Sequence, residues 1–162
     1  MARAIYPGSF DPMTLGHLDI VKRASQLFDE VMMAVVANPG KAPLLPMEVR
    51  VNLIEEAVRE IPNVKVGSFQ GLLVDFAKQN DVSCVIRGLR AISDFEAELG
   101  MAQTNKTLLP ELETIFLMTK AEYSFISSST VKEIVRLGGD VTKFVPSVVN
   151  DHLKRQFSRG IS

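Results

Sequence analysis

Residues 2–17, with the sequence ARAIYPGSFDPMTLGH, carry the pattern that decides the fold. The apolar run Ala2–Tyr6 predicts a buried strand, Gly8-Ser9-Phe10-Asp11-Pro12 predicts a turn, and Thr14-Leu15-Gly16-His17 opens an amphipathic helix. Unpaired backbone N–H groups and the helix dipole converge where such a helix begins, so this junction predicts an anion site. His17, on the first helical turn, would place a neutral or cationic donor beside a bound phosphate.

The junction is neither a Walker loop nor a dinucleotide fingerprint, because the sequence contains neither glycine pattern. An alternative interpretation is that Gly16 permits a tight turn and His17 is a partly exposed surface residue. The position of the pattern, at the first strand-to-helix junction, favours a functional site.

Apolar runs and helical stripes alternate along the whole chain. The runs predict five strands, at Ala2–Tyr6, Val31–Ala37, Val64–Ser68, Val82–Arg87 and Thr114–Met118. Their continuous Val, Ile, Leu and Met content is typical of parallel strands buried on both faces. We therefore expect an α/β fold: one doubly wound, Rossmann-like domain over residues 1–162, with a five-stranded parallel sheet, helices on both faces and a frayed tail at 158–162.

Composition excludes several classes of function. The 162 residues carry a net charge of −1, so no general basic field favours nucleic acid, and no apolar run reaches the ~20 residues that span a bilayer. The single cysteine, Cys84, cannot form an internal disulfide and lies in an apolar run. With no signal-peptide pattern at the N-terminus, we expect a reduced cytoplasmic protein without nucleic-acid or membrane partners.

Ligands of doubly wound sheets bind beyond the carboxyl ends of the strands. The residues there are Ser9 and His17, then Lys41 on the loop 38–43, then Gly71-Leu72-Leu73, then Arg87-Gly88-Leu89-Arg90, and finally 122–130. Arginine forks match phosphate oxygens, although Arg87 and Arg90 have the alternative of pairing with Asp94, Glu96 or Glu98.

Two local patterns predict helix starts. Ser93 and Glu96 have capping-box spacing, and Ser127-Ser128-Ser129-Thr130 supplies capping hydroxyls that would suit a phosphate equally well. No hydrolase triad and no spacing typical of a zinc or iron site is present, so we expect no metal held by protein ligands.

Taken together, Tyr6–Pro12, Thr14-Leu15-Gly16-His17, Ile86–Arg90, Asp94-Phe95-Glu96 and Ser124–Ser129 resemble the bacterial phosphopantetheine adenylyltransferases, members of the nucleotidylyltransferase superfamily. The resemblance implies adenylyl transfer from ATP to 4′-phosphopantetheine, giving dephospho-coenzyme A and pyrophosphate. It implies that Ser9, Lys41, Leu73 and Arg87 hold the acceptor. For ATP it implies Ser9, Phe10, His17, Gly88, Leu89, Arg90, Glu98, Tyr123, Ser124, Phe125, Ile126, Ser127, Ser128 and Ser129.

The acceptor phosphate is already largely dianionic at neutral pH, so we expect direct in-line attack on the α-phosphorus without a general base. His17, Lys41 and Arg90 are the residues we expect to stabilise the developing charge, with Mg²⁺ carried mainly by the ATP phosphates. The resemblance also implies a homo-oligomer, typically a hexamer, and feedback inhibition by coenzyme A.

Other interpretations remain open. The same scaffold serves CTP-dependent glycerol-phosphate enzymes and nicotinamide-mononucleotide adenylyltransferases, and the Arg87–Arg90 and Ser124–Ser129 patterns favour the phosphopantetheine enzyme. A non-catalytic nucleotide sensor would use the same phosphate contacts, but it has less need of His17 and Lys41 at the reacting phosphate.

Overall fold

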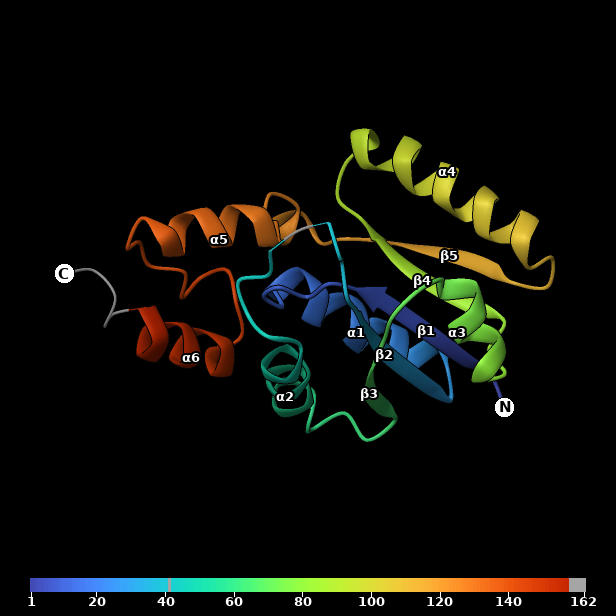
Figure 1. Cartoon of the computed structure of the whole chain (residues 1–162), viewed down its shortest axis with the longest axis horizontal. Coiled ribbons are helices and arrows are strands. Elements are labelled where there is room, and N and C mark those ends of the chain that lie inside the picture. Colours follow the sequence, from blue (N-terminus) through green and yellow to red (C-terminus); the bar gives the residue numbers. More distant parts are fainter. Residues whose placement is uncertain (41, 158–162) are drawn as a thin grey trace.

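One parallel sheet organises the molecule (Figure 1). The computed structural model describes residues 1–40 and 42–157. The strand order is β3-β2-β1-β4-β5, and every neighbouring pair is parallel. The strands are β1 (Arg3–Gly8), β2 (Glu30–Val36), β3 (Val64–Phe69), β4 (Cys84–Leu89) and β5 (Glu113–Met118). All five predicted strands and the parallel sheet are thereby confirmed.

Helices follow the strands as the alternating pattern predicts. They are α1 (Leu15–Leu27), α2 (Met47–Ala57), α3 (Leu73–Gln79), α4 (Ile92–Leu108), α5 (Ser128–Arg136) and α6 (Ser147–Phe157), with a 3-10 turn at Ala121–Tyr123. In Figure 1, α4 runs beside β5, while α5 and α6 lie together at the other end of the molecule. None of the helices within residues 1–40 and 42–157 is long and apolar enough to cross a bilayer.

Two apolar cores cover the two faces of the sheet, because successive strand residues point to opposite sides. In β1, Ala4 and Tyr6 pack into the core that contains residues of α1, α2, α5 and α6. Ile5 between them packs into the other core, with Val74 of α3 and Leu109 just beyond α4. Helices on both faces of the sheet are the predicted arrangement.

The edges of the sheet differ from the sequence prediction. β5 is an edge strand with Ile115 and Met118 exposed, so it is not buried on both faces as its apolar sequence predicted. The predicted capping box at Ser93 and Glu96 is also wrong. The N-cap of α4 is Ala91, which has no side-chain capping bond, and Ser93 already lies within the helix.

The topology places the candidate site. β1 lies between β2 and β4, so the chain crosses from edge strand β3 to the far side of β1 before β4 begins. This is the switch point at which doubly wound sheets bind ligands. The predicted loop residue Lys41 and the predicted frayed tail 158–162 lie outside the described residues.

Candidate active site

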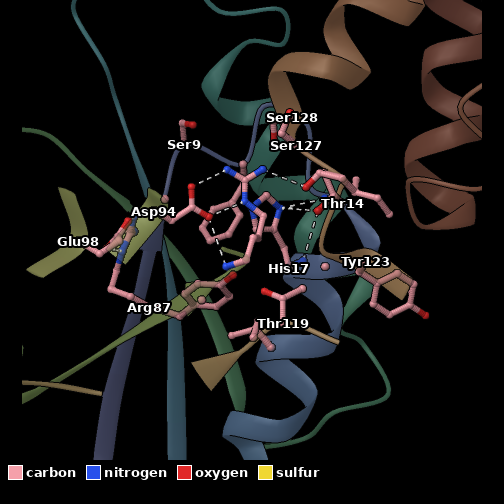
Figure 2. A pocket seen from close by; sticks show the side chains of 18 of the residues that line it. Ser9, Thr14, His17, Arg87, Asp94, Glu98, Thr119, Tyr123, Ser127 and Ser128 are labelled. Carbon is pink, nitrogen blue, oxygen red and sulfur yellow. Dashed lines mark hydrogen bonds and ion pairs between the residues drawn. The ribbon is translucent and has the colours of Figure 1, made fainter. Parts of the chain in front are cut away.

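A cavity of about 400 Å³ opens beyond the carboxyl ends of β1, β4 and β5, between the first turns of α1 and α5 (Figure 2). Of the residues predicted from the sequence, twelve line it: Ser9, Phe10, His17, Arg87, Gly88, Arg90, Glu98, Tyr123, Ile126, Ser127, Ser128 and Ser129. Because these residues come from five separate segments, the topology of the sheet assembles the site.

His17 is fixed by the cap of its own helix. The side chain of Thr14 accepts a hydrogen bond from the backbone N–H of His17, at 3.3 Å. In return, the backbone N–H of Thr14 donates to Nδ1 of His17 at 2.9 Å, which completes a capping box. An Nδ1 that accepts carries no proton, so the proton of the neutral ring resides on Nε2.

The electrostatic surroundings keep this ring neutral. Burial, followed by the nearby charges of Arg87 and Arg90, lowers the pKa of His17 from 6.5 to about 4. Of the two forms that the sequence left open, the structure therefore selects the neutral donor at pH 7.

Aromatic side chains pack around the imidazole ring of His17. The Phe10 and His17 rings lie edge to face with centroids 5.0 Å apart, and Tyr6 packs against Phe10 at 5.3 Å. Phe10 is buried and has a φ of 44°, an uncommon conformation for a bulky residue. A side chain at Gly8 would approach the Phe10 ring to 3.0 Å, which explains the glycine at this position.

Both arginines of the pocket are paired with carboxylates. Arg87 forms two bonds with Glu98, from Nε at 2.8 Å and from Nη2 at 2.6 Å, and its Nη1 donates to the carbonyl of Pro7. Arg90 contacts Asp94 through Nε at 3.2 Å. The pairing alternative raised by the sequence is thus confirmed for Asp94 and Glu98, yet all four side chains also line the cavity.

The first turn of α5 closes the opposite side of the cavity. Ser127 caps this helix by accepting from the backbone N–H of Thr130 at 3.1 Å, as the serine run predicted. Ser128 donates from Oγ to the carbonyl of Pro12 at 2.8 Å and so fastens α5 to the β1–α1 turn. Two helix N-termini, those of α1 and α5, consequently border one pocket, which favours an anionic ligand.

Four predicted residues lie outside the residues that line the cavity. Leu73, the first residue of α3, packs against the core that contains Ile5 and Val74. Leu89 ends β4 and its carbonyl accepts from Thr119. Ser124 donates to Ala121, and Phe125 is 67% exposed with its ring against Phe144. Gly88 and Arg87 lie inside β4, because that strand extends two residues past its predicted end.

Comparison with known proteins identifies the family. Residues 5–134 match the cytidylyltransferase-like family. The phosphopantetheine adenylyltransferase of Synechococcus elongatus is 54% identical over 95% of this chain and 93% of its own length. The phosphopantetheine adenylyltransferase of Caldanaerobacter subterraneus is 51% identical over 98% of this chain and 99% of its own length. The chain belongs to the phosphopantetheine adenylyltransferase family.

More distant relatives share the fold. A Plasmodium falciparum nicotinic acid mononucleotide adenylyltransferase, solved with NaAD, superposes with a TM-score of 0.73 at 15% identity, over 95% of each chain. A Vibrio parahaemolyticus protein, described as a putative nicotinate-nucleotide adenylyltransferase, superposes with a TM-score of 0.68 at 14% identity, over 94% of this chain and 99% of that chain. At such identities the likeness shows the Rossmann-like fold alone.

For this phosphopantetheine adenylyltransferase family member, sequence reasoning missed several pocket residues. Thr119 is 8% exposed, lines the cavity and directly follows β5, so the rule that ligands meet the carboxyl ends of strands would have found it. Ile20 and Ala97 also line the cavity and carried no signal, because they read as ordinary apolar positions of α1 and α4. The Cys84 thiol lies away from the cavity lining, and burial raises its pKa to about 11.

Proposed function

We propose that this chain transfers the adenylyl group of ATP to 4′-phosphopantetheine by direct in-line attack of the acceptor phosphate on the α-phosphorus. The products are dephospho-coenzyme A and pyrophosphate. The observation that carries the proposal is the full-length likeness, at 51–55% identity, to phosphopantetheine adenylyltransferases. A pocket bordered by two helix N-termini and two arginines supports it.

His17 acts in this proposal as a neutral donor. Its Nδ1 is occupied by the N–H of Thr14, so Nε2–H is the group left to bond a phosphate oxygen as charge develops. A pKa of about 4 makes the ring a poor general base or charged acid at pH 7, and an acceptor phosphate with a second pKa near 6 needs no base.

The other roles divide the pocket between two substrates. Arg90 and Lys41 would stabilise the reacting phosphates with His17, while Ser9, Lys41, Leu73 and Arg87 would hold the acceptor. The ATP side would comprise Ser9, Phe10, His17, Gly88, Leu89, Arg90, Glu98 and residues 123–129. Leu73, Leu89, Ser124 and Phe125 are not among the residues that line the cavity, so their proposed contacts would require substrate that extends beyond it.

Mg²⁺ would enter on the ATP phosphates. The two carboxylates that line the cavity, Asp94 and Glu98, are each engaged by an arginine, which leaves them poorly suited to ligate a metal ion. Bound magnesium would neutralise phosphate charge, and the groups of this chain would orient the reactants.

A homo-oligomer, hexameric by family likeness, and inhibition by coenzyme A belong to the same proposal. Apolar residues on α4 and β5 support an interface between copies: Ile92, Met101 and Met118 are all more than half exposed. A cytoplasmic location fits the supply of both substrates.

Pyrophosphate release tests the reaction. Mg-ATP with 4′-phosphopantetheine is compared with CTP plus glycerol 3-phosphate and with ATP plus nicotinamide mononucleotide. Release with the first pair, with dephospho-coenzyme A as product, is expected. Turnover only with another pair would overturn the substrate assignment, and ATP binding without any turnover would favour a sensor.

The His17→Asn variant tests the catalytic role. Asparagine Oδ1 can replace Nδ1 as acceptor for the N–H of Thr14, but nothing replaces Nε2–H. Turnover should fall by about 10²–10³, the usual cost of one transition-state donor, with the Kd for ATP within a few-fold. Near-normal turnover would remove His17 from the mechanism.

A further inference from the structure

Asp11 has no role in the proposed reaction, although it lies in the turn between β1 and α1. It is 3% exposed, and its two carboxylate oxygens accept the backbone N–H groups of Leu44 and Leu45, each at 2.9 Å. These donors lie more than 30 residues further along the chain, in the segment that leads into α2. A buried carboxylate with two backbone donors is strongly held, so Asp11 ties that segment to the β1–α1 turn.

Arg50 holds the same segment from its other side. This residue of α2 is 5% exposed and donates from Nε to the carbonyl of Leu45 at 3.1 Å. Its Nη1 donates to the carbonyl of Ser9 at 2.8 Å. The N–H of Leu45 is thus held by Asp11 and its C=O by Arg50. We call this pair the Asp11–Arg50 clamp.

A third contact connects Asp11 to α5. Nζ of Lys132 lies 3.2 Å from Oδ2 of Asp11, with the lysine side chain 19% exposed. Lys132 is one helical turn beyond Ser128, which bonds the neighbouring carbonyl of Pro12. Asp11 therefore joins three parts of the pocket region: the β1–α1 turn, the segment 42–46, and the helix whose first turn borders the cavity.

We infer that Asp11 is a positioning residue, which sets the alignment between the acceptor side and the ATP side of the site. The inference rests on the proposed function, in which Lys41, three residues before Leu44, serves the acceptor and the first turn of α5 serves ATP. In-line transfer depends on the relative placement of two bound substrates, and a misplacement of about 1 Å can cost 10²-fold in rate. Asp11 is not among the residues that line the cavity, and it acts through Leu44, Leu45 and Lys132.

The Asp11→Asn variant is the test. It has nearly the same shape, but one oxygen becomes an amide that faces a backbone N–H, and the attraction to Lys132 is lost. We expect kcat to fall at least tenfold while the calorimetric Kd for ATP and for 4′-phosphopantetheine each change less than threefold. Asp29→Asn is the matched control, because Asp29 accepts one backbone N–H, from Ala2, at the opposite end of the strands. It should leave kcat and both Kd values unchanged.

Substitutions of Lys132 distinguish an effect of its ion pair with Asp11 from an effect on folding. Lys132→Met should lower kcat in the same sense as Asp11→Asn, and Lys132→Arg, which keeps the ion pair, should restore most of it. A kcat within threefold of wild type in Asp11→Asn would overturn the inference. So would a parallel rise in both Kd values with a fall in Tm, which indicates a purely structural role. Wild-type turnover is the separate check: if the wild type lacks it, the proposed function fails and takes this inference with it.

Discussion

The protonation of His17 should make the stability of this protein depend on pH between 7 and 4. The ring is held neutral by burial and by Arg87 and Arg90, so its pKa is about 4 when folded, whereas an unfolded chain restores about 6.5. Below pH 6.5 the imidazole of the unfolded chain binds a proton, whereas the buried imidazole of the folded chain stays neutral until the pH nears 4. The stability that the neutral ring provides is therefore complete above pH 6.5 and is lost as pH falls toward 4.

The size of the effect follows from the two pKa values. A shift from 6.5 to about 4, at roughly 1.4 kcal/mol for each pKa unit, amounts to about 3 kcal/mol at the acid limit. Between pH 7 and pH 5 the same two values give a loss of about 2 kcal/mol in the free energy of unfolding. This is a large fraction of the 5–15 kcal/mol typical of a whole domain, so it is measurable.

Urea unfolding at pH 7, 6 and 5 measures this loss, with His17→Asn as the control because asparagine preserves the Thr14 cap and does not titrate. The wild type should lose about 2 kcal/mol more than the variant. NMR titration of the ring protons should place the His17 midpoint near 4 in the ligand-free protein. Equal losses in the two proteins, or a midpoint near 6.5, would refute the reasoning.

Two further substitutions test the packing around the pocket. Glu98→Gln leaves the half-buried guanidinium of Arg87 without its carboxylate, so the free energy of unfolding should fall by about 1–2 kcal/mol in urea titrations. Gly8→Ala drives a methyl group to 3.0 Å from the buried Phe10 ring and should cost about 1–3 kcal/mol. Gly67→Ala, where a methyl group meets nothing within 4 Å, should cost less, and the reverse order would contradict the packing argument.

The sheet was predictable from sequence because its signals are local. Most of the strands contain a run of apolar residues, and their alternation with helices predicts parallel pairing. Cap positions were less predictable: the spacing of Ser93 and Glu96 fitted a capping box, but α4 begins after Ala91. The true capping box pairs Thr14 with His17, and no rule based on Glu or Gln would find it.

The contacts that shape the site were beyond sequence reasoning because they join distant residues. Asp11 meets Leu44 and Leu45 across more than 30 positions, and Lys132 across 121. A single chain gives no signal for such pairs until the fold brings them together. The pocket as a whole was still predictable, since its place follows from strand order alone.

Pairing with acids leaves both arginines able to bind phosphate, as the proposed function requires. A guanidinium carries five N–H donors, and the described contacts of Arg87 use three, two with Glu98 and one with Pro7. Arg90 likewise donates through Nε and Nη2 to Asp94 and through Nη1 to Ile126. Donors remain on each fork, and the acid fixes the direction in which they point. Preorganised donors stabilise developing charge without reorganisation during the reaction. Asp94 and Glu98 therefore orient the two guanidinium groups rather than block them. The neutral imidazole of His17 adds a hydrogen-bond donor to the pocket without adding charge.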